Sequence, residues 1–347
     1  MLSMPTGLTS LEMVTVGNPG NASHPITGRG SVSFTYSIGK YEVTAAQYCD
    51  FLNHIAATDP YGLYDTRMDI AVDSRGCNIK RTGSPGSYSY SVPIDWANRP
   101  VNYVSWNDAA RFVNWLNNGQ PSGLPGSATT EDGAYCLTGV ASQQDMLMIT
   151  RKAGAKWVIP SDNEWYKAAY YDPEKLGGSG YWRYPTRSDS DPYNDGADGY
   201  SDPGNHVNFF NGTTYTIGSP YYRTDVGEFE NSASAYGTFD QGGNVWEWDD
   251  LSRMDPWATA CRCTRGLSWY MNTWDTNYLR WLQSYSIEFG RPEGLMFFGP
   301  QDDQTYDVGF RVGMVPEPGS IALLALAALC SAAVLIMQRA SVRTGMM

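Results

Sequence analysis

The segment Arg265 to Arg280 reads RGLSWYMNTWDTNYLR and mixes aromatic with polar residues. It has methionine at position 271 and threonine at position 276, and it contains no cysteine. GGNVWEW (242–248) precedes it and GFRV (309–312) follows it. These three segments, in this order, decide the predicted fold, and the rest of the chain is interpreted around them.

Three amphipathic helices are predicted upstream of these segments. Each begins at a capping box, in which a Ser or Thr and a polar residue three positions later satisfy each other's backbone N–H groups. Apolar residues at helical period follow each box. The boxes are Thr44 with Gln47, Ser105 with Asp108, and Ser161 with Glu164, and Pro173 is expected to end the third helix.

The remaining chain consists of short apolar or alternating stretches broken by Gly, Pro, Asn and Asp. Strands are expected at 33–36, 156–159 and 310–312, and loops at 84–91 and 186–204. No internal repeat or linker interrupts the chain before residue 315. The sequence therefore predicts one domain over residues 12–315, followed by a C-terminal segment over 316–343.

The helices and the three signature segments together resemble the formylglycine-generating enzyme (sulfatase-modifying factor) family. The matching blocks run in the family's order and span about residues 38–312. The resemblance implies an irregular α+β fold related to C-type lectins, with little regular secondary structure and bound calcium. The blocks are YEVTAAQYCDFLN (41–53), RPVNYVSWNDAARFVNWLN (99–117), WVIPSDNEWYKAAY (157–170), GGNVWEW, RGLSW and GFRV.

The family's oxidase chemistry depends on two cysteines that this chain lacks. By resemblance, the family converts a cysteine of a substrate protein to formylglycine with oxygen and a copper ion held by two thiolates. The equivalent positions are Met271 and Thr276. A thioether and a hydroxyl cannot form thiolates, and soft Cu(I) favours thiolate ligands, so copper is not expected. Cys261 and Cys263 lie one residue apart upstream, which does not match the family's arrangement.

Calcium is expected by the same resemblance. Around GGNVWEW, the family's ligand positions correspond to Asp240, Gly243, Val245 and Glu247. Carboxylates and carbonyls suit this hard cation; the alternative is that Asp240 caps a turn and Glu247 makes a salt bridge. A second family site would start at Asn208 and Phe209, but its expected downstream aspartate is missing near Ser219 and Tyr221.

The signature segment is predicted to line a groove. Aromatic side chains there could hold an unidentified peptide or carbohydrate, because aromatic faces supply contact area with polar edges. The alternative places most of them in the core, which is the expectation for Trp269. The residues assigned to the groove are Trp269, Tyr270, Met271, Trp274, Thr276, Tyr278 and Arg280.

Three functions remain open at this point. The first is a binding or structural module that keeps the fold without the oxidase chemistry. The second is an active formylglycine-generating oxidase with a different thiol arrangement. The third is a lectin-like variable surface receptor, in which sibling sequences would differ mainly between Trp269 and Arg291.

The charge balance excludes one class of partner. The formal net charge is -12 at pH 7. A nucleic-acid-binding protein needs a basic footprint for the phosphate backbone, so no nucleic-acid partner is expected. An acidic surface is compatible with calcium or a cationic partner, although solubility alone also explains it.

The C-terminus resembles a bacterial PEP-CTERM sorting signal. Pro316-Glu317-Pro318 is followed by an uncharged apolar run over 321–337 and then by Arg339. The run is nearly long enough to cross a hydrocarbon core, and the arginines after it predict a cytoplasmic C-terminal end. The resemblance implies an exosortase-type processing partner, at least transient membrane anchoring through this helix, and a final location in the envelope or extracellular matrix of a Gram-negative bacterium.

Two further expectations follow from export. The first seventeen residues contain no basic region followed by an apolar one. The export signal is therefore expected to precede residue 1; the alternative is that export uses another route. Cysteines at 49, 77, 136, 261 and 263 lie outside the apolar tail. Because five is odd, at least one thiol is expected to stay free or to pair between molecules.

Overall fold

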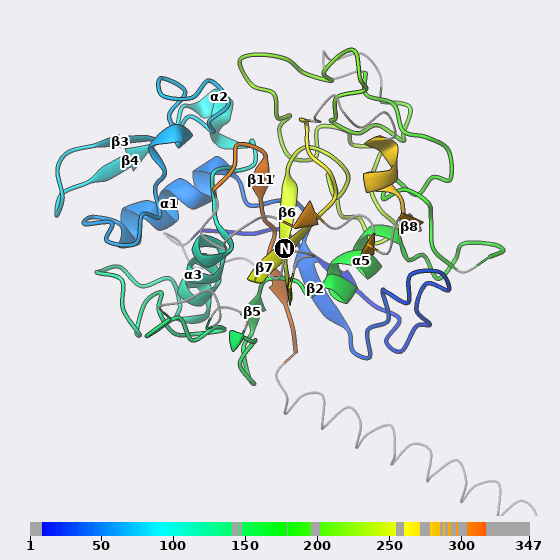
Figure 1. Cartoon of the computed structure of the whole chain (residues 1–347), viewed down its shortest axis with the longest axis horizontal. Coiled ribbons are helices and arrows are strands. Elements are labelled where there is room, and N and C mark those ends of the chain that lie inside the picture. The colour runs from blue at the N-terminus through cyan, green and yellow to red at the C-terminus, as the bar shows by residue number, and fades with distance from the viewer. Residues whose placement is uncertain are drawn as a thin grey trace, which may run out of the picture.

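The computed structural model describes residues 9–140, 145, 148–178, 180–195, 202–254, 260–270, 278–284, 287–288, 291–292, 296–297 and 304–316. Long loops connect short elements, and few helices are present among these residues (Figure 1). The expected mixed α/β class with little regular structure is confirmed. The helices are α1 (Ala45–Ile55), α2 (Ile94–Ala97), α3 (Trp106–Asn117) and α5 (Asp162–Tyr170), with 3-10 turns η1 (Thr66–Met68) and η2 (Tyr278–Leu282).

Two four-stranded sheets organise the domain. The first is antiparallel with strand order β1-β2-β12-β5, and the second has the order β10-β7-β6-β11, with β11 parallel to β6. The strands of the first sheet are β1 (Met13–Val16), β2 (Tyr36–Gly39), β12 (Gly313–Met314) and β5 (Trp157–Val158). Those of the second are β10 (Met296–Phe297), β7 (Ala260–Arg265), β6 (Trp246–Met254) and β11 (Val308–Gly309).

Two small antiparallel pairs are the remaining strands among the described residues. They are β3 (Lys80–Thr82) with β4 (Ser89–Ser91), and β8 (Ile287–Glu288) with β9 (Arg291–Pro292). The first pair corrects the loop predicted over 84–91, because the end of that segment is β4. The alternation of serine with Tyr90 fits a strand that buries one face, and Tyr90 is buried.

All three predicted helix starts are confirmed. Thr44, Ser105 and Ser161 cap α1, α3 and α5, and each capping box is complete on both sides. The third helix ends at Tyr170, before Pro173. A capping box satisfies two backbone donors that would otherwise be exposed at the helix start, which is why this short pattern is a reliable signal.

The strand predictions are less accurate. Lys156–Ile159 contains β5, but the strand predicted at 33–36 begins only at Tyr36 and continues to Gly39. Phe310–Val312 lies between β11 and β12 rather than in a strand. The described part of 186–204 is a loop, as predicted, apart from isolated bridges. Strands of two to four residues are too short for period-two alternation to define them.

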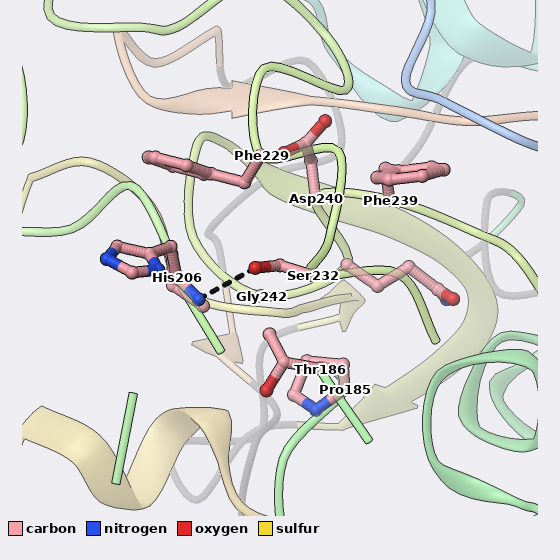
Figure 2. Close-up of a pocket in the computed structure, with 10 residues that line it drawn as sticks. Pro185, Thr186, His206, Phe229, Ser232, Phe239, Asp240 and Gly242 are labelled. Atoms are coloured by element: carbon pink, nitrogen blue, oxygen red, sulfur yellow. Dashed lines mark hydrogen bonds between the residues drawn. The ribbon is translucent and has the colours of Figure 1, made fainter. Parts of the chain in front are cut away.

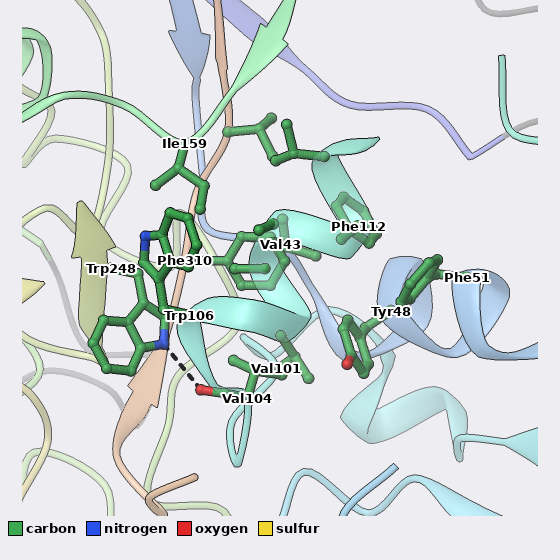
Figure 3. Close-up of a cluster of buried hydrophobic side chains, with 14 of the residues drawn as sticks. Val43, Tyr48, Phe51, Val101, Val104, Trp106, Phe112, Ile159, Trp248 and Phe310 are labelled. Atoms are coloured by element: carbon green, nitrogen blue, oxygen red, sulfur yellow. Dashed lines mark hydrogen bonds between the residues drawn. The ribbon is translucent and has the colours of Figure 1, made fainter. Parts of the chain in front are cut away.

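The hydrophobic core joins the helices to the signature segments. Phe310 of GFRV is fully buried and packs against Phe112 of α3, with ring centroids 5.3 Å apart. Trp248 of GGNVWEW donates through Nε1 to the Val104 carbonyl at 2.9 Å (Figure 3). Burying a side chain of this size stabilises the fold by roughly 1.5–3 kcal/mol. GFRV and GGNVWEW therefore contribute side chains to the hydrophobic core.

The C-terminal prediction lies almost entirely outside the described residues. Pro316 is the last described residue, so Glu317, Pro318, Arg339 and the apolar run over 321–337 receive no structural description. Within the described part of the chain, no helix has the length and apolar character needed to span a bilayer.

Candidate functional site

A buried ion pair lies where two signature segments meet. Strand β6 places Glu247 opposite Gly309 of β11, which brings GFRV beside GGNVWEW. Arg311 donates to both Glu247 oxygens, from Nε at 2.5 Å and from Nη2 at 2.6 Å. Trp165 of α5 adds a third bond to Glu247, at 2.7 Å. Both charged side chains are 0% exposed, so each depends on the other for compensation.

This pairing bears on the predicted calcium ligands Asp240, Gly243, Val245 and Glu247. Glu247 makes the salt bridge that was its alternative role, with a guanidinium occupying both of its oxygens. Asp240 accepts a bond from the Gly227 N–H at 2.6 Å. Burial raises the pKa of Asp240 to about 6. In this arrangement Glu247 has no free carboxylate oxygen to offer a metal, whereas Asp240 is not paired with an arginine in this way.

Gly243 has a separate structural requirement. It adopts φ +80°, and a Cβ there would lie 2.2 Å from the carbonyl oxygen of Asn208. The two residues form an isolated parallel bridge. Only glycine allows this close approach, which brings the segment of the second predicted calcium site against GGNVWEW.

Glu42 is a component of this centre that sequence reasoning missed. It is 2% exposed, and neither of its carboxylate oxygens has a hydrogen-bond partner. Burial, and then the charge of Asp240, raises the pKa of Glu42 well above its usual range. The available signal was a glutamate between Tyr41 and Val43, directly before the cap of α1, where a core-facing residue would be expected.

The arrangement of Glu42 and Asp240 fits a hard cation. Buried carboxylate oxygens without hydrogen-bond partners are rare in native proteins and call for a proton, water or ion. Calcium takes carboxylate and carbonyl oxygens in flexible geometry. No group of three or more His, Cys, Asp or Glu side chains placed to hold a metal occurs among the described residues. A cation here would therefore need backbone carbonyls as well as these two carboxylates.

At the second predicted calcium site, the Asn208 side chain and the Phe209 carbonyl make hydrogen bonds within the protein. The Phe209 carbonyl accepts bonds from Thr216 at 3.1 Å and Asn194 at 3.3 Å. The Asn208 amide donates to the Asn244 side chain and to the Tyr222 carbonyl, both at 3.0 Å. Downstream, Ser219 is exposed, and Tyr221 packs on Trp96 and donates to Asp95. The four positions thus serve separate local contacts.

A small pocket lies next to Asp240. Phe229, Phe239 and Asp240 lie on one side and Thr186 on the other (Figure 2). His206 forms part of the wall; its ring stacks on Phe229, and Nε2 lies 3.1 Å from Asp195. The remaining lining residues are Pro185, Val207, Ser232, Gln241 and Gly242. Its polar lining beside a carboxylate suits a water molecule or an ion.

The start of RGLSWYMNTWDTNYLR forms the centre of an aromatic cluster. Trp269 is 1% exposed, in agreement with its expected core position. Tyr222 stacks on it, with centroids 4.6 Å apart and planes at 28°. Tyr215, Tyr270 and Tyr306 surround the indole at 5.8, 5.5 and 6.0 Å. We call Tyr215, Tyr222, Trp269, Tyr270 and Tyr306 the aromatic cluster.

The cluster is more exposed at its edges than at its centre. Tyr215 is 37% exposed, and Tyr222, Tyr270 and Tyr306 are half-buried. Three of the four tyrosines come from outside the signature segment, on loops that the sequence could not place next to it. A buried indole surrounded by partly exposed rings offers flat apolar faces with polar rims, a combination common at binding surfaces.

The other predicted groove residues are described only in part. Met271, Trp274 and Thr276 lie outside the described residues, and so does the side chain of Tyr278. Arg280 lies in η2 and is half-buried. The structure therefore brings Trp269 and Tyr270 into one cluster and leaves the rest of the groove as a prediction.

The described thiols do not resemble an oxidase centre. Cys49, Cys77 and Cys263 are buried and Cys136 is exposed. Burial raises the pKa of Cys49 to about 12 and also raises that of Cys77. Protonated thiols are poor nucleophiles and poor metal ligands. The side chain of Cys261 lies outside the described residues.

The fold is similar to that of solved structures of low sequence identity. CarF matches with a TM-score of 0.50 and 19% identity, over 88% of this chain and 99% of that chain. Treponema denticola variable protein 1 matches with a TM-score of 0.48 and 19% identity, over 90% and 98%. At this identity the likeness to CarF concerns the fold alone. A search of curated protein sequences finds no match.

A family model decides the assignment. The model of the sulfatase-modifying factor enzyme 1-like domain matches residues 5–313, which is nearly the whole length described above. The match includes the three capped helices, the Glu247–Arg311 pair and the segment that carries Trp269. The chain belongs to the sulfatase-modifying factor enzyme 1-like domain family.

Proposed function

We propose that this chain is an exported, surface-associated member of the family that binds a ligand and lacks the copper and thiol oxidase chemistry. The observation that carries the proposal is the aromatic cluster around Trp269, with partly exposed tyrosines at its edges. The sequence adds Met271 and Thr276, where the oxidase needs cysteines. A domain that binds a ligand without oxidising it needs the aromatic surface but not the reactive cysteines.

The cluster supports binding of a peptide or carbohydrate. Tyrosine faces contribute apolar contact at low entropic cost, and their hydroxyls supply hydrogen bonds. Because the indole of Trp269 is held between Tyr222 and its other neighbours, the exposed rings are fixed before the ligand arrives. Preorganisation of this kind reduces the ordering cost of binding.

Substitution of the cluster tyrosines tests this proposal. The isolated domain is screened against arrayed peptides and oligosaccharides, and Tyr222→Ala and Tyr270→Ala are then titrated with the ligand found. We expect each substitution to weaken binding about ten-fold or more, as for aromatic anchors at interfaces. Tyr61→Ala is the control, because Tyr61 is 45% exposed but contacts Arg111 and no member of the cluster. Undiminished binding by both variants would refute the proposal.

Oxygen consumption tests the alternative of an active oxidase. The domain is supplied with copper, a reductant and a cysteine-containing sulfatase peptide. We expect no copper-dependent turnover, because three of the four described thiols are buried and positions 271 and 276 hold no cysteine. Formylglycine formation would show that another thiol arrangement is active.

We further propose that calcium supports the scaffold at Glu42 and Asp240. The support is the pair of buried Glu42 oxygens that have no hydrogen-bond partner and lie near the half-buried carboxyl of Asp240. Metal analysis should find calcium without copper, and calcium should raise the melting temperature of the wild-type domain. Glu42→Gln should abolish that rise, while Glu230→Gln, on an exposed position, should keep it. If calcium has no effect and Glu42→Gln is more stable, Glu42 is a buried protonated carboxyl.

The C-terminal segment supplies the location in this proposal. The order Pro316-Glu317-Pro318, apolar run, Arg339 supports processing by an exosortase-type enzyme and membrane anchoring through the apolar helix. Expression in a host with such an enzyme should release a domain that ends near the Pro-Glu-Pro motif. Deletion of 316–318 should leave the full-length chain unprocessed.

A further inference from the structure

Two Asp-x-Arg units lie beside the aromatic cluster. In each, the aspartate accepts a bond from the backbone N–H of the arginine two residues later, from Arg67 to Asp65 at 2.7 Å and from Arg75 to Asp73 at 2.9 Å. The same aspartate then binds the guanidinium, at 2.5 Å in the first unit and 2.7 Å in the second. Each aspartate therefore holds the side chain of its arginine in one conformation.

Both guanidinium groups lie over tyrosine rings. Arg75 is 4.0 Å from the ring centre of Tyr306, and Arg67 is 4.8 Å from that of Tyr103. The Tyr103 hydroxyl donates to Asp73 at 2.6 Å and so joins the two units. Stacking on aromatic faces and a fixed carboxylate together leave little rotational freedom to either arginine.

The arginine backbone is fixed as well. The carbonyl of Arg75 accepts one bond from Asn102 and another from Arg223, both at 2.8 Å. Arg223 is fully buried, and burial lowers the pKa of its guanidinium to about 10. Because the buried Arg223 donates hydrogen bonds to the backbone carbonyls of residues 75 and 76, the fold fixes the position of Arg75.

The Asp-x-Arg units and the aromatic cluster are joined through Tyr306. Tyr306 is shared, since it carries Arg75 and also packs edge-on against Tyr270 at 5.1 Å. The arginine side chains are 47% and 38% exposed, whereas their partners Asp65 and Asp73 are 10% and 16% exposed. Nη2 of Arg67 also donates to the Gln304 carbonyl at 3.1 Å, so the exposed guanidinium of Arg75 is the group that this surface offers to an anion, with its partner Asp73 turned inward.

We propose that this surface binds an acidic oligosaccharide, a chain of sugars that carry carboxylates. Pyranose rings have flat C–H faces that suit the exposed tyrosines, and planar guanidinium groups recognise carboxylates through paired, charge-assisted bonds. This inference rests on the proposed binding function and names its ligand class. In a chain of net charge -12, the exposed Arg75 at the aromatic cluster provides local complementarity to an anion that the rest of the surface would repel.

Matched probes isolate the contribution of charge. Short oligogalacturonates and their methyl esters have the same rings, but only the acids carry charge. Isothermal titration of the isolated domain should show about ten-fold or tighter binding of the acids than of the esters, consistent with charge-assisted hydrogen bonds. Raising the salt concentration should weaken binding of the acids more than that of the esters.

Two arginine variants make the test specific. Arg75→Gln should remove most of the preference for the acids, while Arg81→Gln should keep it. Arg81 is a matched control, because it also stacks on a tyrosine, 4.4 Å from the ring of Tyr88, and pairs with Asp59. It belongs to β3, at an edge of the molecule away from β11 (Figure 1). If Arg75→Gln unfolds the domain, Arg75→Lys keeps the charge without the planar fork and should lose part of the preference.

The outcomes separate this inference from the proposed function. Equal affinity for acids and esters, with binding still lost in Tyr222→Ala, overturns the inference and leaves a binding module for neutral ligands. Tighter binding of an acidic peptide than of any acidic oligosaccharide, dependent on Arg75, also overturns it. If no arrayed ligand binds through the cluster, both proposals fail.

Discussion

At the residue scale, Glu247 and Arg311 are buried charges that the fold satisfies completely. Arg311 also donates to the carbonyls of Gly39 and Phe239, at 3.0 and 2.9 Å. The pair therefore links the first sheet, the loop before GGNVWEW and strand β6. Its effect on stability comes mainly from what remains if one partner is lost, because the desolvation of the other charge is then uncompensated.

Glu247→Gln should destabilise the domain by about 3–5 kcal/mol, because the buried Arg311 guanidinium loses the carboxylate to which it is hydrogen-bonded. Urea denaturation of the two proteins measures the difference. Glu12→Gln is the control, since Glu12 pairs with Lys40 at the surface and should change stability by at most about 1 kcal/mol. Similar losses in the two variants would contradict the importance assigned to the buried pair.

Asp249 is a buried charge that the fold satisfies only in part. It is 0% exposed; Oδ1 accepts from the Leu251 N–H at 2.8 Å, while Oδ2 has no hydrogen-bond partner. Arg265 approaches only to 3.7 Å. Burial raises the pKa of Asp249 to about 7, whereas Arg265 opposes the shift. Asp249 lies where the pairing of β6 with β7 shifts register, between Trp248 and Ser252.

The pH dependence of stability should report this carboxyl. Because the folded pKa is raised, its contribution to stability is complete below about pH 4 and is lost as pH rises towards 7. Asp249→Asn does not titrate, so its stability relative to wild type should rise over that range, by on the order of 2–4 kcal/mol. Asp73→Asn should show the opposite trend in a lower window: bonds from Arg75 lower the Asp73 pKa, so wild type should lose stability relative to this variant as pH falls below about 4. A pH-independent difference for Asp249→Asn would exclude a titrating carboxyl at this site.

At the element scale, the three capped helices show how local chemistry can outweigh an irregular context. The Ser161 box has an additional support, because Glu164 also receives two bonds from Arg151, at 3.0 and 2.9 Å. The start of α5 is therefore fixed by its own cap and by a neighbouring ion pair. That start also positions Trp165, which binds Glu247.

Ser161→Ala should cost about 1 kcal/mol of stability, because the Glu164 N–H loses its side-chain acceptor. Ser161→Thr keeps the hydroxyl and should be nearly neutral. Chemical denaturation with matched slopes distinguishes the two. A full loss in the Thr variant would show that side-chain volume, rather than the cap, decides stability at this position.

The capping boxes were predictable because each is complete within four residues. The strands were not, because their lengths and pairings depend on partners distant in the sequence: β12 pairs with β2 and β5, more than 150 residues upstream. The hairpin of β3 and β4 was missed for a related reason. Its Gly- and Ser-rich turn dominates the composition of 84–91 and hides the short strand that follows.

At the scale of the whole molecule, the last described strand closes the domain. β12 lies between β2 and β5 in the first sheet, and the Val315 N–H donates to the Lys156 carbonyl just beyond it. The N-terminal and C-terminal parts of the domain therefore meet in one sheet. Removing β12 would separate β2 from β5. Residues after 316 follow β12 in the chain, so removing them leaves β12 in place.

Two truncations test this closure. A chain that ends at Pro316 should unfold at nearly the same temperature as a longer one that keeps the apolar run. A chain that ends at Val312 should lose cooperative unfolding, because β2 and β5 each lose their central partner. Circular dichroism during heating measures both. Equal melting of the Val312 and Pro316 chains would show that β12 is dispensable.

The candidate site was predictable only where it coincides with a local motif. Trp269 and Tyr270 belong to the signature segment, and Asp240 and Glu247 to the segment around GGNVWEW. Tyr222 and Arg75 carried no such signal. They reach the site through irregular loops, whose paths are set by contacts such as those of Arg223 with the loop at 75–76 rather than by periodicity.

The sequence by itself determined the family, the helix starts and the absence of cysteine from residues 265–280, because each is written in a few neighbouring residues. Only the tertiary structure decided that Glu247 pairs with Arg311, that Glu42 lies unpaired beside Asp240, and that tyrosines from three loops surround Trp269. Those relations join residues far apart in the chain, and they exist because burial and backbone geometry, rather than local pattern, bring the loops together. RGLSWYMNTWDTNYLR therefore supplies the centre of the surface, and the rest of the fold supplies its edges.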